Sequence, residues 1–254
     1  MPVNINLDIN KIADDTISPI TRRISTTLIS IWDLTFGHID NMNEKYQLRR
    51  EQELNDYKQQ LETEINKIDP DNLVEPKLSV VGPALESSKF YYEEKELRSM
   101  FAKLVASSMD SSKTTKVRTS FTHIIQQLDK IDSLNLLSFQ DKTRKPIARA
   151  ETGYNSYRFT NDKRYQYIFF SSHDIEPLSD AMSSSIDNLQ RLGLVEVTFD
   201  RWYEDESIYN NYHDSSYIFS YTSGNPSHGN GYMPAEHGLI YLTTLGIQFI
   251  DVCL

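Results

Sequence analysis

The chain has 254 residues, 39% of them apolar, which is enough for the core of one large or two ordinary domains. Its longest weakly polar run, residues 26–39, contains Asp33 and is shorter than the roughly 20 residues that cross a membrane, so no membrane span is predicted. The net charge of −10 lies in residues 171–254, where twelve acidic side chains face two arginines, while residues 1–170 are balanced.

Residues 1–72 are predicted to form an N-terminal helical hairpin or bundle. Isoleucine and leucine recur at steps of three and four over residues 17–31, and Pro19 suits the first turn of that helix. A second apolar set runs from Ile39 to Ile68 and ends before Asp69-Pro70-Asp71. Its near-heptad spacing leaves two interpretations open: a hairpin that packs on the rest of the protein, or a coiled-coil arm for self-association.

The next predicted domain, residues 73–254, begins with helices. Apolar side chains indicate a helix around residues 80–85, where Pro83 either bends the helix or marks its start. A stronger stripe from Leu97 to Val105, with Glu93 and Glu94 at its beginning, predicts a helix, and another stripe covers residues 121–128. Asp129 and Asp132 are predicted to cap the end of one helix and the start of the next.

The C-terminal half is predicted to mix helices and strands. Residues 140–160 suit a loop or short hairpin, 165–172 a strand, and 174–192 a helix that ends at Gly193. Two further strands, at 194–199 and 216–221, precede a last strand and a final helix capped by Thr243. The predicted fold class is therefore mainly α with an α+β C-terminal half, in which a winged-helix-like domain follows the N-terminal helices.

Three segments carry a resemblance to a known family. They are LVEPKLSVVGPALESSKFYYEEKELRSMFAKLVASSMD, VRTSFTHIIQQLDKIDSLNLL and YLTTLGIQFIDVC. They resemble the Abi-alpha (abortive infection alpha) family of bacteria and their mobile elements, whose pattern contains an ELR-x-x-F-A helix, a His-Pro segment and a terminal L-T-x-x-G-x-x-F. The resemblance implies a part in antiphage defence and brings no catalytic residues. Arg118-Thr119 stand where the pattern has His-Pro, so no role of that dipeptide is carried over.

The helix predicted at 174–192 does not have the composition of a helix that reads DNA. A groove-reading helix presents basic and amide side chains to phosphates and bases, with its contacts near its N-terminal end. Here Asp174, Glu176, Asp180 and Asp187 stand against a single Arg191. We therefore expect a scaffold used for packing or for protein contact, with the first acids serving as caps and dipole partners.

A basic stretch between residues 142 and 164 is the candidate interaction site. Its members are Lys142, Arg144, Lys145, Arg149, Arg158, Lys163 and Arg164. Aromatic residues that could stack on bases lie between them. Three interpretations remain open: a solvated surface, contact with protein, including the acidic end of the same or a neighbouring chain, and nucleic-acid binding.

The sequence gives no support for catalysis, a cofactor or a metal site. It contains no phosphate-binding loop, dinucleotide fingerprint, nucleophile elbow or HExxH motif, and its six histidines show no close ligand spacing. The group His213, Asp214, His228, Glu236 and His237 could converge only through folding. A single cysteine, Cys253, and the lack of an apolar signal core near the start favour the cytoplasm.

The sequence therefore predicts a cytoplasmic defence protein that acts by binding a protein partner or by assembling into a homo-oligomer. One alternative is a nucleic-acid-binding regulator that uses the basic stretch. Another is a membrane-acting effector that uses residues 17–39 as an amphipathic helix at the membrane surface.

Overall fold

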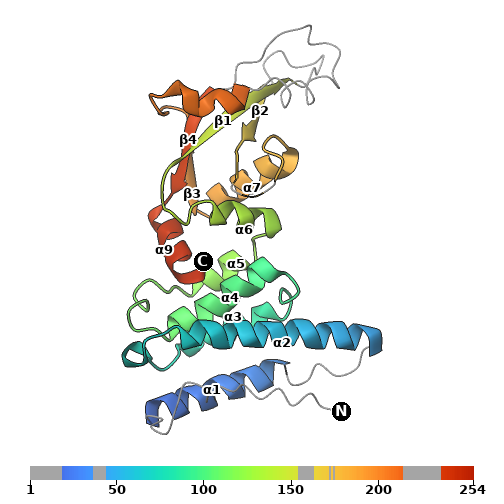
Figure 1. The fold of residues 1–254 in the computed structure, drawn as a ribbon, viewed down its shortest axis with the longest axis vertical. Helices are drawn as coiled ribbons and strands as arrows, with labels where there is room; N and C mark the ends of the chain where they lie inside the picture. The colour runs from blue at the N-terminus through green and yellow to red at the C-terminus, as the bar shows by residue number, and fades with distance from the viewer. Residues whose placement is uncertain (1–18, 37–43, 154–162, 172, 174, 214–235) are drawn as a thin grey trace. The chain divides into compact units, whose positions relative to one another are not determined.

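The computed structural model describes residues 19–36, 44–153, 163–171, 173, 175–213 and 236–254 (Figure 1). They form two compact units, one containing the described residues up to 130 together with 248–254, the other residues 131–247. The first unit is helical and the second contains a four-stranded sheet, so the predicted class of mainly α with α+β character is confirmed. The domain boundary predicted after residue 72 falls inside the first unit and stays a prediction.

The helices of the first unit follow the predicted apolar stripes. They are α1 (Pro19–Phe36), α2 (Glu44–Asn66), the 3-10 helix η2 (Pro70–Asn72), α3 (Leu78–Ser88), α4 (Lys95–Ser108), α5 (Ser120–Ile125) and the end of α9 (Thr244–Cys253). Helix α1 begins at Pro19, as predicted, and α3 includes Pro83, which therefore does not mark its start. The buried face of α2, made by Leu54, Tyr57, Leu61 and Ile65, is used within the chain, where α2 packs on α4.

An aromatic cluster joins α1 to α2. Trp32 and Phe36 are one helical turn apart, with ring centroids separated by 4.5 Å, and both contact Tyr57 of α2 at 5.4 Å and 6.1 Å. Trp32 and Tyr57 are fully buried, and burial raises the pKa of the Tyr57 hydroxyl well above its ordinary value. The apolar face of α1 is therefore occupied by the protein itself.

A buried arginine connects α2 to the start of α4. Arg98, which is 7% exposed, donates from Nη1 to Oε2 of Glu53 at 2.6 Å. The same nitrogen contacts the main-chain carbonyl oxygens of Glu53 at 3.3 Å and Tyr92 at 3.1 Å. A buried charge is tolerated when it is paired and hydrogen-bonded in this way. Arg98 therefore fixes α2 against the turn between α3 and α4.

The second unit is built on an antiparallel sheet with the strand order β2-β1-β4-β3. Its elements are α6 (Lys130–Leu137), β1 (Lys145–Gly153), β2 (Lys163–Ile168), α7 (Asp180–Arg191), β3 (Val195–Thr198), the 3-10 helix η3 (Glu206–His213) and β4 (Glu236–Leu242). Strand β1 lies in the segment predicted as a loop or short hairpin, residues 140–160, but its partner β2 lies beyond that segment and overlaps the strand predicted at 165–172. The strand predicted at 216–221 lies outside the described residues.

The two faces of β1 carry different side chains because neighbouring residues of a strand alternate. Ala148 and Ala150 are small and buried, and they leave room for the rings of Tyr209 and Tyr212 from η3. The hydroxyl of Tyr209 donates to the carbonyl oxygen of Gly238 at 2.9 Å, and that of Tyr212 donates to the carbonyl oxygen of Pro146 at 2.8 Å. Helix η3 is thereby fastened to this face of the sheet.

Helix α7 begins later than predicted, at Asp180 instead of residue 174. Ser179 caps it by accepting a hydrogen bond from the amide of Met182 at 3.1 Å. Before the cap, the amide of Phe169 donates to the carbonyl oxygen of Pro177 at 3.0 Å, and Leu178 forms an isolated antiparallel β-bridge with Ile168. Pro177 and Leu178 therefore contact the end of β2 at the edge of the sheet, and Glu176 precedes the helix instead of lying in it.

Buried polar groups join α7 to α6. The amide nitrogen Nδ2 of Asn135 donates to the hydroxyl of Ser185 at 2.9 Å, and Nδ2 of Asn188 donates to Asp132 at 2.7 Å. Asp132, predicted as a helix cap, lies instead inside the first turn of α6 and is 2% exposed, whereas Asp129 directly precedes the helix. The capping interpretation of Asp132 was wrong because its carboxylate is used in tertiary packing.

One hydroxyl group joins the end of α7 to the start of α9. Gly193, with a φ of +70°, ends α7 as predicted. Its carbonyl oxygen accepts from the Thr243 hydroxyl at 2.5 Å, and the amide of Gly246 donates to the same hydroxyl at 2.9 Å, so Thr243 caps α9 as predicted. A Cβ on Gly246 would lie 2.0 Å from the carbonyl oxygen of Leu194, which only glycine avoids.

The buried arginine leads to a stability prediction. Replacing Arg98 by Met should lower the free energy of unfolding by about 3 kcal/mol, because Glu53 loses its charged partner and two carbonyl oxygens lose a donor. Urea unfolding of the full chain, followed by far-UV circular dichroism, measures the change. Lys89→Met is the control, since Lys89 forms a surface ion pair with Glu86, and such pairs contribute roughly 0–1 kcal/mol. Equal unfolding midpoints for the two variants would contradict the assignment.

Candidate interaction surface

The predicted basic residue Arg149 is neutralised and covered within the second unit. In the sheet it stands between Tyr167 of β2 and Glu236 of β4. Its Nε lies 2.6 Å from Oε2 of Glu236, and its guanidinium carbon lies 4.5 Å from the ring centre of Tyr165 and 4.2 Å from that of Phe199. The basic stretch and the acidic C-terminal region therefore attract each other inside one chain at this position.

A glycine makes this arrangement possible. A Cβ on Gly238 of β4 would lie 2.5 Å from the carbonyl oxygen of Thr198 and 2.7 Å from the ring of Phe199. Because Gly238 has no side chain, the Phe199 ring can lie against the sheet. There its plane is parallel to that of the Tyr167 ring, and the two ring centroids are 6.3 Å apart. Phe199 thus supports Arg149 from a segment that follows β3.

The other predicted basic residues have different surroundings. Lys145 pairs with Asp141 at 2.5 Å, and the hydrogen bond from Lys145, together with one from the Thr143 amide, lowers the pKa of Asp141 to about 2. Lys142 is exposed in a turn with a φ of 56°. Lys163 and Arg164 belong to β2, but their side chains, like the whole of Arg158, lie outside what the structure describes.

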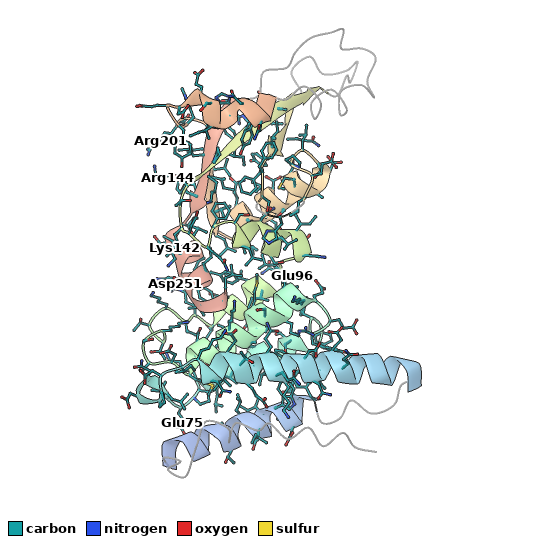
Figure 2. All side chains as sticks on the ribbon, viewed as in Figure 1. Glu75, Glu96, Lys142, Arg144, Arg201 and Asp251 are labelled. Atoms are coloured by element: carbon teal, nitrogen blue, oxygen red, sulfur yellow. The ribbon has the colours of Figure 1, made fainter. Side chains whose placement is uncertain are left out.

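Arg144 belongs to a second group that the sequence did not predict. Its guanidinium carbon lies 5.3 Å from the ring centre of Tyr241, and the Tyr241 hydroxyl donates to Glu196 at 2.8 Å. The hydrogen bond to Glu196 is the main cause that raises the pKa of Tyr241, while the charges of Arg201 and Arg144 act in the opposite direction. Both arginines are exposed and lie along the same side of the second unit (Figure 2).

An exposed tryptophan follows Arg201 in the chain. Trp202 is 53% exposed. The next residue, Tyr203, anchors the segment, because its hydroxyl donates to the carbonyl oxygen of Arg144 at 2.8 Å and its amide donates to the Tyr209 hydroxyl at 3.2 Å. We call Arg144, Arg201, Trp202 and Tyr241 the arginine–tryptophan surface. A local signal for it was present in the sequence, since Arg201-Trp202 interrupts an acidic segment.

Helix α7 itself does not present a basic face. Over Asp180–Arg191 it contains two carboxylates, and Arg191 donates to Asn188 of the same helix at 2.7 Å. Asp180 accepts a hydrogen bond from Gln166, and burial raises the pKa of Asp187. Asp174, one of the acids counted in the prediction, lies outside the described residues. The repulsion predicted between this helix and phosphates rests on Asp180 and Asp187.

The described residues contain neither a membrane-spanning helix nor a cluster of metal-ligating side chains. None of their helices is long and apolar enough to cross a membrane. Nor do their His, Cys, Asp and Glu side chains gather into a group that could hold a metal ion. Asp214 and His228 of the group around His213 lie outside the described residues, as does the side chain of His213, so the convergence of the group stays a prediction.

Comparison with known proteins gives one match. The family model described as abortive infection alpha matches residues 49–253. No curated protein and no solved structure matches the chain.

The hydrogen bond between Tyr241 and Glu196 leads to a titration prediction. Glu196→Gln should lower the pKa of Tyr241 toward the ordinary tyrosine value, because the carboxylate that favours the protonated phenol is removed. Carbon-13 NMR of the full chain labelled at the tyrosine ring measures the titration, with Tyr241→Phe identifying the signal. As a control, Glu204→Gln removes an exposed acid elsewhere in the second unit. Identical Tyr241 midpoints in the wild type and Glu196→Gln would contradict the contact.

Proposed function

The chain belongs to the abortive infection alpha family, and we propose that it acts in defence against phage by binding a polypeptide partner rather than by catalysis. In this proposal a product of infection provides the trigger, the cytoplasmic protein senses it through a protein surface, and a change in assembly limits phage production. The partner class includes a second copy of this chain.

The arginine–tryptophan surface is the observation that supports binding to protein. Tryptophan, tyrosine and arginine are the residue types that most often contribute the binding energy of protein interfaces. Here Arg144 and Arg201 both act on Tyr241, and Trp202 is the exposed residue that follows Arg201. Two hydrogen bonds made by Tyr203 hold the segment that carries Arg201 and Trp202. A pre-positioned surface loses less conformational entropy on binding than a flexible one does.

The scaffold of this surface is proposed to be a winged-helix-like unit that is used for protein contact. Its α7, Gly193, β3 and β4 follow in the order of a recognition helix and its wing. Asp180 stands at the start of α7, where a groove-reading helix presents its contacts, and the charge of Arg149 is neutralised by Glu236. Both features disfavour DNA binding.

Nucleic-acid binding is the second candidate function, because an exposed tryptophan that follows an exposed arginine in the chain also suits single strands. A base can stack on an indole ring while the arginines contact phosphates. The membrane alternative has less support, since Leu28, Trp32 and Phe36 of α1 are buried in the first unit and are not presented to a lipid surface.

The protein-binding proposal predicts a loss of protection in one variant. Trp202→Ala should abolish the reduction in plaque number that the wild-type chain gives in a phage-sensitive host, because truncating a central interface tryptophan weakens binding by about 2 kcal/mol or more, roughly thirtyfold. Plaque counts and survival of infected cells are measured together. Phe90→Ala is the matched control, since Phe90 is an exposed aromatic residue of the first unit.

Two outcomes would contradict the proposal. One is a wild-type chain that leaves plaque numbers unchanged across a broad phage panel. The other is full protection by Trp202→Ala at wild-type protein level. Light scattering of the purified Trp202→Ala and wild-type chains then separates the two partner classes, because only self-association through this surface changes the measured mass.

A binding experiment separates the protein and nucleic-acid functions. Fluorescence anisotropy measures binding of labelled single-stranded DNA and RNA to the wild type and to the variant Arg144→Gln, Lys145→Gln, Arg149→Gln. We expect weak binding that differs little between the two, because Lys145 and Arg149 are already paired with carboxylates. Tight binding by the wild type that falls steeply with salt and is lost in the variant would favour the nucleic-acid regulator.

A further inference from the structure

Residues 200–208 of the second unit are strongly acidic and expose two large apolar side chains. We call these residues the acidic loop. Its acidic side chains are all exposed, and the single basic residue among them is Arg201: Asp200, Glu204, Asp205 and Glu206. Trp202 is 53% exposed and Ile208 is 39% exposed. The acidic loop therefore combines negative charge with apolar surface that the described residues leave uncovered.

Three carboxylates of the acidic loop have no partner that neutralises them. Those of Asp200, Glu204 and Glu206 form neither a hydrogen bond nor an ion pair with another described residue. Arg201, the basic residue of the loop, acts on Tyr241. Carboxylates that lie close together repel each other, and a cation that docks among them relieves this repulsion. The acidic loop therefore has negative charge available for a partner.

Hydrogen bonds within the second unit hold the acidic loop in shape. The amide of Tyr203 donates to the hydroxyl of Tyr209 at 3.2 Å, and the amide of Ile208 donates to the carbonyl oxygen of Asp205 at 3.2 Å. Oδ1 of Asp205 accepts from the hydroxyl of Ser207 at 2.5 Å and from its amide at 3.0 Å, and both bonds lower the pKa of that carboxyl group. Since these donors are neutral, Asp205 keeps its charge. A loop fixed in this way loses less conformational entropy on binding than a flexible one does.

We propose that the acidic loop binds a polypeptide segment in which a lysine or arginine stands next to an apolar side chain. The apolar side chain covers Trp202 and Ile208, and the basic group pairs with Glu204 and Glu206. A carboxylate of the same partner suits the exposed arginines, so the partner carries both charges, whereas the acidic loop repels a polyanion such as a nucleic acid. This inference rests on the proposed function, because it specifies the chemistry of the polypeptide partner.

Selection from a display library of random dodecapeptides on the immobilised full chain tests the proposal. The enriched peptides should carry lysine or arginine next to an aromatic or aliphatic residue. The double variant Glu204→Gln, Glu206→Gln should lose the preference for basic residues, and Trp202→Ala should lose the preference for the apolar residue. The matched control is Glu93→Gln, Glu94→Gln, which removes two exposed carboxylates of the first unit and should select the same peptides as the wild type.

The affinity of the most enriched peptide provides a second readout. Fluorescence anisotropy of the labelled peptide should show binding about fivefold weaker in Glu204→Gln, Glu206→Gln than in the wild type, since each exposed ion pair contributes little. Binding to the wild type should weaken as salt rises, and the double variant should show less of this dependence. Both substituted side chains are exposed, so the variant is expected to fold as the wild type does.

Three results would overturn the proposal. The first is enrichment of acidic peptides, or of none, on the wild-type chain. The second is an equal preference for basic residues in the wild type and in Glu204→Gln, Glu206→Gln. The third is an equal loss of that preference in the control Glu93→Gln, Glu94→Gln, which would indicate attraction to the overall negative charge instead of to the acidic loop.

The proposed function fails through a different result, namely full protection against phage by Trp202→Ala. If Trp202→Ala loses protection while the wild type enriches acidic peptides, the polypeptide partner stands and only the charge inferred for it is wrong.

Discussion

The hydroxyl group of Thr243 fixes the end of α7 to the start of α9, directly after β4, the strand that carries Tyr241 of the arginine–tryptophan surface. It donates to Gly193 at the end of α7 and accepts from Gly246 at the start of α9, so the helix before β3 and the helix after β4 meet at one atom. This works only because Gly193 adopts a positive φ and Gly246 has no Cβ to strike Leu194. With these ends fixed, β3 and β4 pair in one register, and Tyr241 lies opposite Glu196.

Charge in this protein is balanced by contacts that the linear sequence does not show. Residues 142–164 are basic and residues 171–254 are acidic, yet Arg149 and Glu236 are 87 positions apart and 2.6 Å from each other. Among the described residues of the second unit, Arg144 and Arg201 remain exposed, and both act on the aromatic residue Tyr241. Such a group suits a partner that offers both carboxylates and apolar side chains, which polypeptides do.

Helical spacing was sufficient to predict α2, α4 and α5, because each buries one stripe whose period is visible in the sequence. The start of α7 was not predictable from spacing, since Leu178 is apolar and in phase but belongs to a bridge with Ile168. Strand β1 was not apparent from the sequence because it contains Pro146 and charged residues such as Arg149, whose partner Glu236 lies on β4. For the same reason the sequence indicated Arg144 but not its contact with Tyr241, which depends on where β4 lies next to β1. Features that depend on register and on long-range pairing therefore required the structure.

The way in which η3 is fastened has a consequence for how its outer surface can evolve. Tyr209 and Tyr212 both donate to carbonyl oxygens of the backbone, acceptors that every amino acid possesses and that no point substitution at Gly238 or Pro146 deletes chemically. Between these two anchors, Asn210 and Asn211 point to solvent and take no part in the attachment. Substitutions at Asn210 and Asn211 are therefore expected to change the outer surface of η3 while Tyr209 and Tyr212 keep the helix attached to the sheet.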